Sequence, residues 1–349
     1  MKRIANHFLS VTVFFLIFIF SVKTLEFLIV PISRADYFLH DIDRMKKNGE
    51  NIDMLIIGNS HSLFGFDPIV FEEKLGLDNA YNASIQALQL SSEYLITESI
   101  VEKFKPQIIV AEVDWTSLID YGTERTQYKL LGLDRLTGIR KIRHIINDFE
   151  PSERIYAISK LYRFRDNIFS QDIITSNIKV KRWAESTHYE DNYYQTIKGY
   201  DKGIACVTQP FQPNKREPFD MKKVSEHNKR YLDLFVKLCK SKNIHLFFVT
   251  PPVSALFHMN IGNYQEILDF YKNYAKENDV FYFDMNMLKN RDEIFNDFAF
   301  YDDGHLCEPG ALAASTVLSN LISDELAGID TNELFYESMD VLSADFQSK

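Results

Sequence analysis

The sequence predicts an α/β fold with three layers, in which helices cover both faces of a parallel sheet of about five strands. Short apolar runs alternate with amphipathic stretches along most of the chain, which is the pattern of strands joined by helical crossovers. The 349 residues are 46% hydrophobic and 25% charged, which supplies a large core and excludes intrinsic disorder as the main state. A net charge of −10 disfavours nucleic acid as a partner.

The amino-terminal segment is apolar enough to enter a membrane. Phe8–Val22 carries no charge, and the apolar character continues to Pro31, interrupted by Lys23 and Glu26. A spanning helix needs roughly 20 such residues. No small-x-small cleavage site follows, so residues 1–32 are expected to form an uncleaved, single-pass signal anchor with a cytoplasmic tip. A cleaved signal peptide is the alternative, and both place the rest of the chain outside the cytoplasm, in the periplasm or at the cell surface.

Five short apolar runs are expected to form the sheet. They are Met54–Ile57, Tyr81–Asn82, Gln107–Val113, Ile244–Val249 and Val280–Phe283. The first run, MLII followed by a glycine, is typical of a strand that is buried on both faces. Such strands pair in parallel when helices connect them, and their carboxyl ends then meet at the edge where ligands bind.

Amphipathic helices are expected between these strands and after the last one. Asp67–Lys74 has a proline at its first turn, and Gln89–Phe104 shows apolar side chains at helical spacing until a proline ends it. Three further helices are expected at Met221–Lys242, Tyr264–Asn278 and Glu308–Leu326.

The segment of about 115–220 interrupts this alternation. Apolar side chains recur at helical spacing between Leu136 and Ile168, so we expect a mostly helical insertion that covers one side of the site. Its aromatic side chains could bind sugar faces and its arginines an anionic polymer, although packing and a solvated helix face explain them at least as well. The insertion divides a domain of residues 50–325, and residues 326–349 are expected to form an acidic surface helix or tail.

The cysteines and histidines give no sign of a metal site. Cys206, Cys239 and Cys307 are widely spaced and form no CxxC pair, which argues against a zinc ribbon and against a disulfide framework. In an oxidising compartment at least one of the three would stay unpaired. The nine histidines form no HxxxH or HExxH pair, so we expect no metal and no other cofactor.

Two short polar segments carry the candidate chemistry. GNSHS (58–62) directly follows the first strand, and DDGH (302–305) directly precedes the last helix. A serine at a strand-to-helix turn presents its hydroxyl at the carboxyl edge of the sheet, and it becomes a nucleophile when a histidine takes its proton and a carboxylate orients that histidine. Asp302 lies three residues before His305, a spacing that lets it reach one ring nitrogen while the other faces Ser60.

These two segments resemble the first and last motif blocks of the SGNH/GDSL hydrolase superfamily. GNSHS matches the first block, with Ser60 as its nucleophile, and DDGH matches the closing Asp-x-x-His. Leu306 and the following Gly310-Ala311 match the frequent tail of that block. The resemblance covers roughly residues 50–115 and 220–325, and it implies a flavodoxin-like sheet and a Ser60–His305–Asp302 triad that needs no cofactor.

The anchor and the insertion look most like bacterial cell-envelope members of that superfamily. Some of those modify surface polymers, such as polysaccharide O-acetyltransferase or esterase proteins and the D-alanyl-transfer protein of teichoic acid. The resemblance therefore implies a membrane-anchored serine esterase or O-acyltransferase that acts on an acylated carbohydrate or envelope polymer. Water as the acyl acceptor gives an esterase, and a sugar hydroxyl gives a transferase.

The expected oxyanion hole departs from the family pattern. The second block usually supplies a glycine N–H, and Ser84 stands at the equivalent place here, so the backbone N–H groups of Ser60 and Ser84 are the expected donors. The third block usually supplies an asparagine, but the third strand ends in EVDW, and the carboxylate of Asp114 cannot donate. Asn59, His61 and Asp114 are expected to contact substrate.

This departure keeps other classes of function open. The main alternative is a catalytically inactive binding or assembly protein of the cell envelope that retains the same scaffold. A weaker alternative is a glycan-binding protein that works through the aromatic side chains of the insertion. Ser60→Ala separates a catalyst, which loses its phenotype, from a binding module, which keeps it.

Overall fold

The computed structural model describes residues 2–31, 34–118, 126–183, 195–202, 204–212 and 224–348. Its contacts divide the chain into two compact units. The helical unit comprises Met1–Tyr37 and Leu136–Glu190, and the sheet unit comprises Phe38–Arg135 and Asp191–Lys349. Both polar motif segments belong to the sheet unit.

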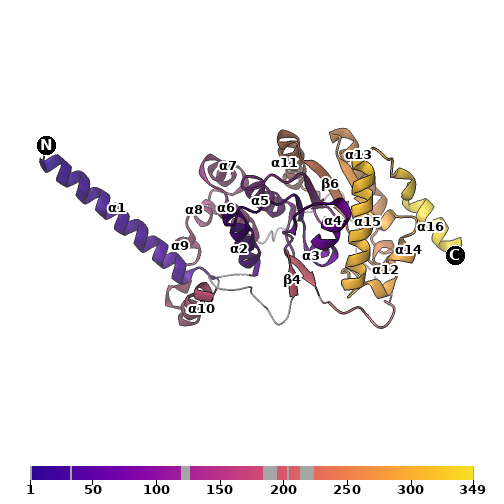
Figure 1. The fold of residues 1–349 in the computed structure, drawn as a ribbon, viewed down its shortest axis with the longest axis horizontal. Coiled ribbons are helices and arrows are strands. Elements are labelled where there is room, and N and C mark those ends of the chain that lie inside the picture. Colours follow the sequence, from indigo (N-terminus) through magenta and orange to yellow (C-terminus); the bar gives the residue numbers. More distant parts are fainter. Residues whose placement is uncertain are drawn as a thin grey trace. The chain divides into compact units, whose positions relative to one another are not determined.

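The sheet unit is built on five parallel strands (Figure 1), which confirms the predicted sheet. The strands are β1 (Met54–Ile57), β2 (Ala80–Asn82), β3 (Ile108–Glu112), β6 (His245–Thr250) and β7 (Phe281–Asp284). Their order, β2-β1-β3-β6-β7, is that of the flavodoxin-like doubly wound class. Ile56 pairs with Asn82 on one side and with Val110 on the other, so β1, β2 and β3 end at one edge.

Helices cover both faces of the sheet, as predicted. They are α3 (Ser60–Gly65), α4 (Pro68–Leu75), α5 (Leu90–Val101), α11 (Glu226–Lys242), α13 (Tyr264–Asn278) and α15 (Glu308–Leu326). α15 packs on α3 and α4 over a core that includes Phe247, whereas α11 packs on α5 and places Phe235 edge-on against Phe248. Because successive side chains of a strand point to opposite faces, Phe247 and Phe248 enter the two different cores.

The ends of α4 show how the local sequence determines where a helix begins and ends. The side chain of Asp67 caps the helix by accepting the N–H of Ile69 at 3.0 Å, and Pro68 takes the first turn. Gly76 ends the helix in the left-handed conformation, with φ of 65°. The predicted helix is therefore confirmed to within one or two residues.

Shorter elements complete the sheet unit. They are α2, which begins in the helical unit (Arg34–Lys47), α6 (Thr126–Arg135), α12 (Ala255–Met259), η3 (Met285–Met287), α14 (Arg291–Ile294), η4 (Asp297–Ala299), η5 (Asn332–Leu334) and α16 (Met339–Ser348). The predicted carboxyl-terminal tail is thus partly helical.

One part of the expected helical insertion is a β-hairpin. β4 (Gln195–Ile197) and β5 (Tyr200–Lys202) pair antiparallel. The two turn residues, Lys198 and Gly199, have φ of 49° and 84°, the combination of a tight hairpin turn. A Cβ on Gly199 would lie 1.8 Å from the carbonyl oxygen of Asn82, so the glycine also allows the hairpin to approach the end of β2. Residues 119–125, 184–194 and 213–223 of the insertion lie outside the described residues.

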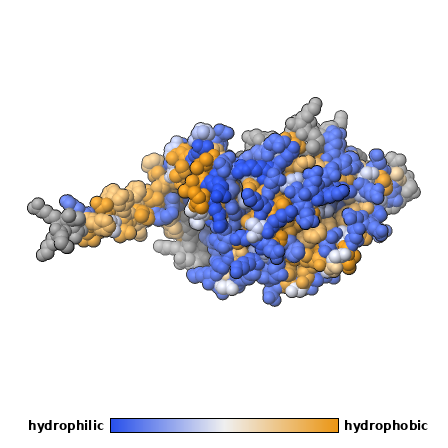
Figure 2. Space-filling view, turned by 90° about the horizontal axis from the view of Figure 1, so that it is seen from above, coloured by the Kyte–Doolittle hydropathy of each residue, from blue (hydrophilic) through white to orange (hydrophobic). Residues whose placement is uncertain are grey.

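The helical unit contains the amino-terminal helix and most of the insertion. Its elements are α1 (Lys2–Ile29), α7 (Gly138–Asp148), α8 (Arg154–Ile158), α9 (Lys160–Arg163), η1 (Arg165–Phe169) and α10 (Gln171–Trp183). α1 is long and apolar enough to cross a membrane, by length and composition, and Figure 2 shows a hydrophobic surface along most of it.

Candidate active site

Ser60 begins α3 directly after β1, at the carboxyl edge of the sheet. Asn59 caps this short helix, and its side-chain oxygen accepts the N–H of His61 at 2.9 Å. Ser60 stays partly exposed, whereas Ser62, on the same turn, is fully buried. The fold therefore presents one of the two motif serines to the outside.

The structure brings the three expected triad residues together. Ser60 Oγ lies 2.8 Å from Nε2 of His305, across 245 residues of sequence. Nδ1 of His305 lies 2.9 Å from Oδ1 and 3.0 Å from Oδ2 of Asp302. A hydroxyl, an imidazole and a carboxylate in this sequence of contacts are the groups that a nucleophilic serine requires.

A tight turn fixes the acid and the base in this geometry. Oδ1 of Asp302 also accepts the backbone N–H groups of Gly304 at 2.9 Å and of His305 at 2.8 Å. Partial burial raises the pKa of Asp302, but the hydrogen bond from the His305 ring and these two N–H groups outweigh it, so the pKa lies below its usual value. The backbone of Tyr301 closes the turn by donating to the carbonyl of His305 at 2.8 Å.

A disulfide joins this turn to a distant loop, contrary to the expectation from cysteine spacing. Cys307, two residues after His305, is bonded to Cys206, with Cα atoms 5.0 Å apart. Val207 donates its N–H to the carbonyl of Phe300 at 2.9 Å and continues the attachment. The spacing could not reveal the bond because 101 residues separate the two cysteines. Cys239 is a free, buried thiol.

Glu112, at the end of β3, contacts the turn that carries Ser60, and no sequence motif marks it for this place. It is fully buried, and its Oε2 accepts the backbone N–H groups of Asn59 and Ser62, both at 3.0 Å. A Cβ on Gly58 would lie 2.4 Å from the same oxygen, which explains the glycine before the nucleophile turn. Its other oxygen, Oε1, lies 3.0 Å from Nδ1 of His61. Glu112 thus supports the backbone on both sides of Ser60.

His61 lies beside the triad without belonging to it. Its ring stacks on that of His305, with centroids 5.1 Å apart and planes 17° apart, and its other neighbour is Trp115 at 5.5 Å. Burial lowers the pKa of His61, but the hydrogen bond and charge of Glu112, followed by the charges of Asp114 and Asp302, outweigh it and raise the pKa overall. The side chain is 13% exposed, so its expected contact with substrate stays a prediction.

The side chains of Asp114 and Asn59 are engaged in hydrogen bonds inside the protein rather than available to a substrate. Asp114 is fully buried, and its Oδ1 accepts the N–H and hydroxyl groups of Thr116 and Ser117 at 2.7–2.9 Å. Nδ2 of Asn59 donates to its Oδ2 at 3.3 Å. These bonds leave Asp114 no surface for the substrate contact expected from the sequence, and Asn59 is only 8% exposed.

The expected oxyanion donor Ser84 also needs a correction. Its N–H donates to Oδ1 of Asn82 at 3.0 Å, and the residue is fully buried. Ile85 then bonds to the carbonyl of Gly58 at 3.1 Å, which brings this loop to the nucleophile turn. Beyond it, Ala87 is exposed with φ of 56°, and within the described part of the chain its N–H donates no hydrogen bond. Ala87 is therefore a better candidate donor than Ser84.

A metal ion could be held among the described residues by His61, Glu112 and Asp114, whose ligand atoms lie within 4.8 Å of one another. The carboxylate oxygens of this group are, however, already engaged by the N–H and O–H donors described above. Behind them lies Glu93 of α5, fully buried. Burial, together with the charges of Glu112 and Asp114, raises the pKa of Glu93 well above its usual value.

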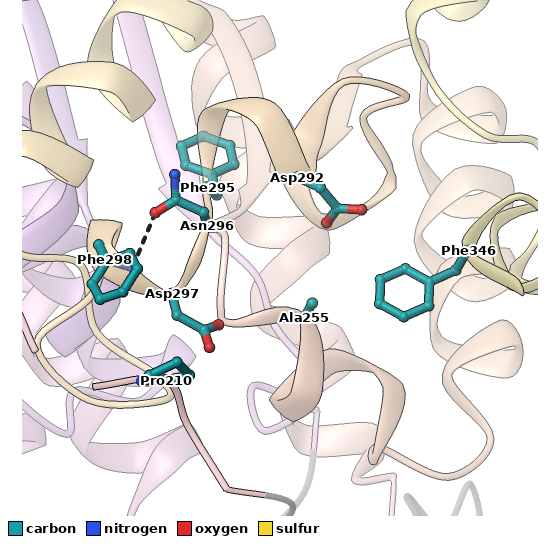
Figure 3. Close-up of a pocket in the computed structure, with 8 residues that line it drawn as sticks. All are labelled: Pro210, Ala255, Asp292, Phe295, Asn296, Asp297, Phe298 and Phe346. Carbon is teal, nitrogen blue, oxygen red and sulfur yellow. Dashed lines mark hydrogen bonds between the residues drawn. The ribbon is translucent and has the colours of Figure 1, made fainter. Parts of the chain in front are cut away.

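A hollow of about 490 Å³ has a lining that includes no triad residue (Figure 3). Its lining comprises Pro210, Ala255, Asp292, Phe295, Asn296, Asp297, Phe298 and Phe346. Phe298 donates its backbone N–H to Oδ1 of Asn296 at 3.0 Å, the dashed bond in Figure 3. No triad residue lines this hollow, so it is not the candidate active site.

Comparison with known proteins does not identify the activity of this site. No protein-family model matches the chain, and no curated protein matches it. Among solved structures, it is similar to a carbohydrate acetylesterase family member from Sinorhizobium meliloti, with 10% identity, a TM-score of 0.33, and coverage of 80% of this chain and 100% of that one. It is also similar to a protein from Bacteroides fragilis that is provisionally assigned as an acylhydrolase, with 10% identity, a TM-score of 0.34, and coverage of 83% and 97%.

At such low identity and TM-score the likenesses do not decide the activity.

Proposed function

We propose that this protein is a membrane-anchored serine esterase or O-acyltransferase of the SGNH kind, acting on acylated glycans or polymers of the cell envelope. The observation that carries the proposal is the chain of contacts from Ser60 Oγ through the His305 ring to the Asp302 carboxylate, at 2.8 and 2.9 Å. Proximity of these three groups activates a hydroxyl that is otherwise a weak nucleophile.

The first half-reaction acylates the enzyme. Ser60 Oγ attacks the acyl carbonyl carbon while its proton passes to Nε2 of His305. Asp302 keeps the other ring nitrogen protonated and stabilises the imidazolium. The bond to the leaving alkoxide then breaks, and His305 returns the proton to the leaving oxygen. Backbone N–H groups of Ser60 and Ala87 are the proposed donors to the oxyanion.

The second half-reaction transfers the acyl group to a hydroxyl. The acceptor gives its proton to His305 as its oxygen attacks the acyl carbon, and Ser60 is released with the proton that His305 returns. The same residues serve water, which yields an esterase, and a sugar hydroxyl, which yields a transferase. Exclusion of water from the acyl-enzyme favours transfer.

The contacts at the end of α1 support an anchor that stays attached. The side-chain amide of Asn177 donates to the carbonyls of Leu28 at 2.8 Å and Val30 at 2.9 Å, and that of Asn167 donates to Ile29 at 3.0 Å. Carbonyls at a helix end need such partners. A helix whose end is built into the insertion fits a retained anchor better than a cleaved signal peptide.

Intact mass after treatment with a fluorophosphonate probe tests the proposal. Wild type should gain one adduct, and Ser60→Ala and His305→Ala should gain none. Ser62→Ala is the matched control, because that buried hydroxyl has no hydrogen-bond partner among the described residues and the backbone N–H that Glu112 holds survives the change. Absence of an adduct on folded wild type would instead favour the binding or assembly protein, the alternative suggested by Asp114 in place of an asparagine.

A further inference from the structure

Large apolar side chains of the helical unit are exposed beside the end of α1. Phe169 is 94% exposed and Ile168 is 41% exposed, both on η1. Asn167, the residue before them, donates to the carbonyl of Ile29, the last residue of α1. Ile168 and Phe169 therefore directly follow a residue that is hydrogen-bonded to the end of the proposed membrane helix.

A second apolar face lies on α7. Ile139, Ile142 and Ile146 are 68%, 51% and 55% exposed, and their spacing of three and four residues places them on one side of the helix. Arg143, also exposed, borders this stripe, while Ile145, between Ile142 and Ile146 in the sequence, is buried. α7 packs on α8, α8 on α9, and α9 on α1, so the stripe belongs to the same compact unit as the membrane helix.

Cationic and aromatic side chains stand beside these apolar groups. Tyr162 is 41% exposed, and the guanidinium of Arg165 lies 4.3 Å from its ring centre. Lys160 and Arg163 lie on the same short helix. Asp166 is the acidic residue of η1, and it pairs with Arg165 at 3.9 Å. Tyrosines and cations next to exposed apolar residues are typical of protein surfaces at a membrane interface.

We propose that two exposed apolar patches of the helical unit, Ile168 and Phe169 of η1 and the three isoleucines of α7, rest in the headgroup region of the bilayer that α1 spans. The inference relies on the anchor in the proposed function. Isolated exposed apolar residues are ordinary, but a set of them beside the end of a membrane helix calls for a partner.

A lipid surface is the partner that best matches the positively charged side chains beside these apolar groups. Side chains on such a face enter the boundary between headgroups and acyl chains by about 5–10 Å, and neighbouring arginines and lysines then contact anionic headgroups. The consequence is that α1 does not act as a loose tether, because the helical unit is seated on the membrane at several points.

Fluorescence quenching of full-length protein in lipid nanodiscs tests whether the helical unit contacts the bilayer. F169C and I142C are each labelled with bimane in nanodiscs of phosphatidylcholine and phosphatidylglycerol that contain headgroup-proximal nitroxide lipid. L312C is the matched control, since Leu312 is 55% exposed on α15 of the sheet unit. The native cysteines give little background, because Cys206 and Cys307 are bonded and Cys239 is 1% exposed. We expect strong loss of fluorescence at positions 169 and 142 and little at 312.

A label within α1, at F14C, separates this inference from the anchor. If position 14 is quenched but positions 169 and 142 are quenched no more than position 312, the inferred contact with the bilayer is overturned and the anchor stands. No quenching at 14 would remove the anchor and this contact together. Protection of position 169 from aqueous iodide, without quenching by nitroxide lipid, would also overturn the inference and assign the patches to a protein partner.

Discussion

Oε2 of Glu112 lies 3.0 Å from the backbone nitrogen of Ser62, on the interior side of the turn that carries the nucleophile. The same oxygen holds the N–H of Asn59 at 3.0 Å, so one carboxylate supports the backbone both before and after Ser60. The close approach of this carboxylate requires Gly58, where a Cβ would lie 2.4 Å away. The end of the third strand therefore acts on the nucleophile turn rather than on the substrate.

Glu112→Gln should destabilise this turn. A glutamine amide can offer its one oxygen either to the two backbone N–H groups or to the His61 ring. Its NH₂ group then meets the backbone donors, or it meets Nδ1 of His61, which is a donor when it carries a proton. We expect a loss of about 1–3 kcal/mol in the free energy of unfolding and slower labelling by the fluorophosphonate probe. Denaturant titration and the labelling rate measure the two effects.

Glu93→Gln is the matched control for that variant. Burial and the charges of Glu112 and Asp114 raise the pKa of Glu93 well above its usual value, which favours the neutral carboxylic acid, a group of nearly the same shape as the glutamine amide. Glu93→Gln should therefore cost less stability than Glu112→Gln and leave the labelling rate near that of wild type. Equal losses in the two variants would mean that Glu112 has no special role at the turn.

Asp302→Asn should remove the orientation of the base while keeping its position. The asparagine side chain can donate to Nδ1 of His305, which then presents a proton rather than a lone pair to Ser60. A loss of about 10⁴-fold in turnover of 4-nitrophenyl acetate is expected. Asp303→Asn, one residue further along the same turn, is the control and should retain activity. A variant Asp302→Asn that keeps wild-type turnover would exclude the triad mechanism.

The sheet and the polar motifs were predictable because their signals are local. The run Met54–Ile57 and the short segment 302–305 each carry their own pattern, and parallel strands bring such segments to one edge. Contacts between distant positions that no motif marks were not predictable. Glu112 accepts a hydrogen bond from Asn59, which is 53 residues away in the sequence, and Cys206 forms a disulfide with Cys307, which is 101 residues away.

The oxyanion donor was misjudged for a conformational reason. Ser84 occupies the expected place in the sequence, but the side chain of Asn82, two residues earlier, takes its N–H. Ala87, an exposed residue of the same loop whose N–H donates no hydrogen bond among the described residues, has a φ of 56°, a left-handed conformation that no local pattern around an alanine predicts.

The stability contributed by His61 should depend on pH. Burial lowers its pKa, but the hydrogen bond and charge of Glu112, with the charges of Asp114 and Asp302, raise it above the usual 6.5. The contribution is then fully present below about pH 6.5 and is lost as the pH rises through the raised pKa. The advantage of wild type over His61→Gln in free energy of unfolding should therefore shrink as the pH rises above about 6.5. A pKa below 6.5, measured by NMR titration of the ring, would contradict this.

Loss of the disulfide should weaken both the fold and the site. The bond closes a loop of about 100 residues, for which chain entropy predicts a stabilisation of roughly 2–5 kcal/mol. The double variant Cys206→Ala/Cys307→Ala should lose this amount in denaturant titration, and reduction of wild type should reproduce it. Because Cys307 lies two residues after His305, the labelling rate of Ser60 should fall as well. Cys239→Ala, which removes the buried free thiol, is the control for reductant, since reduction should still destabilise that variant as it does wild type. An unchanged labelling rate in the folded double variant would mean that the disulfide stabilises the chain without holding the catalytic turn.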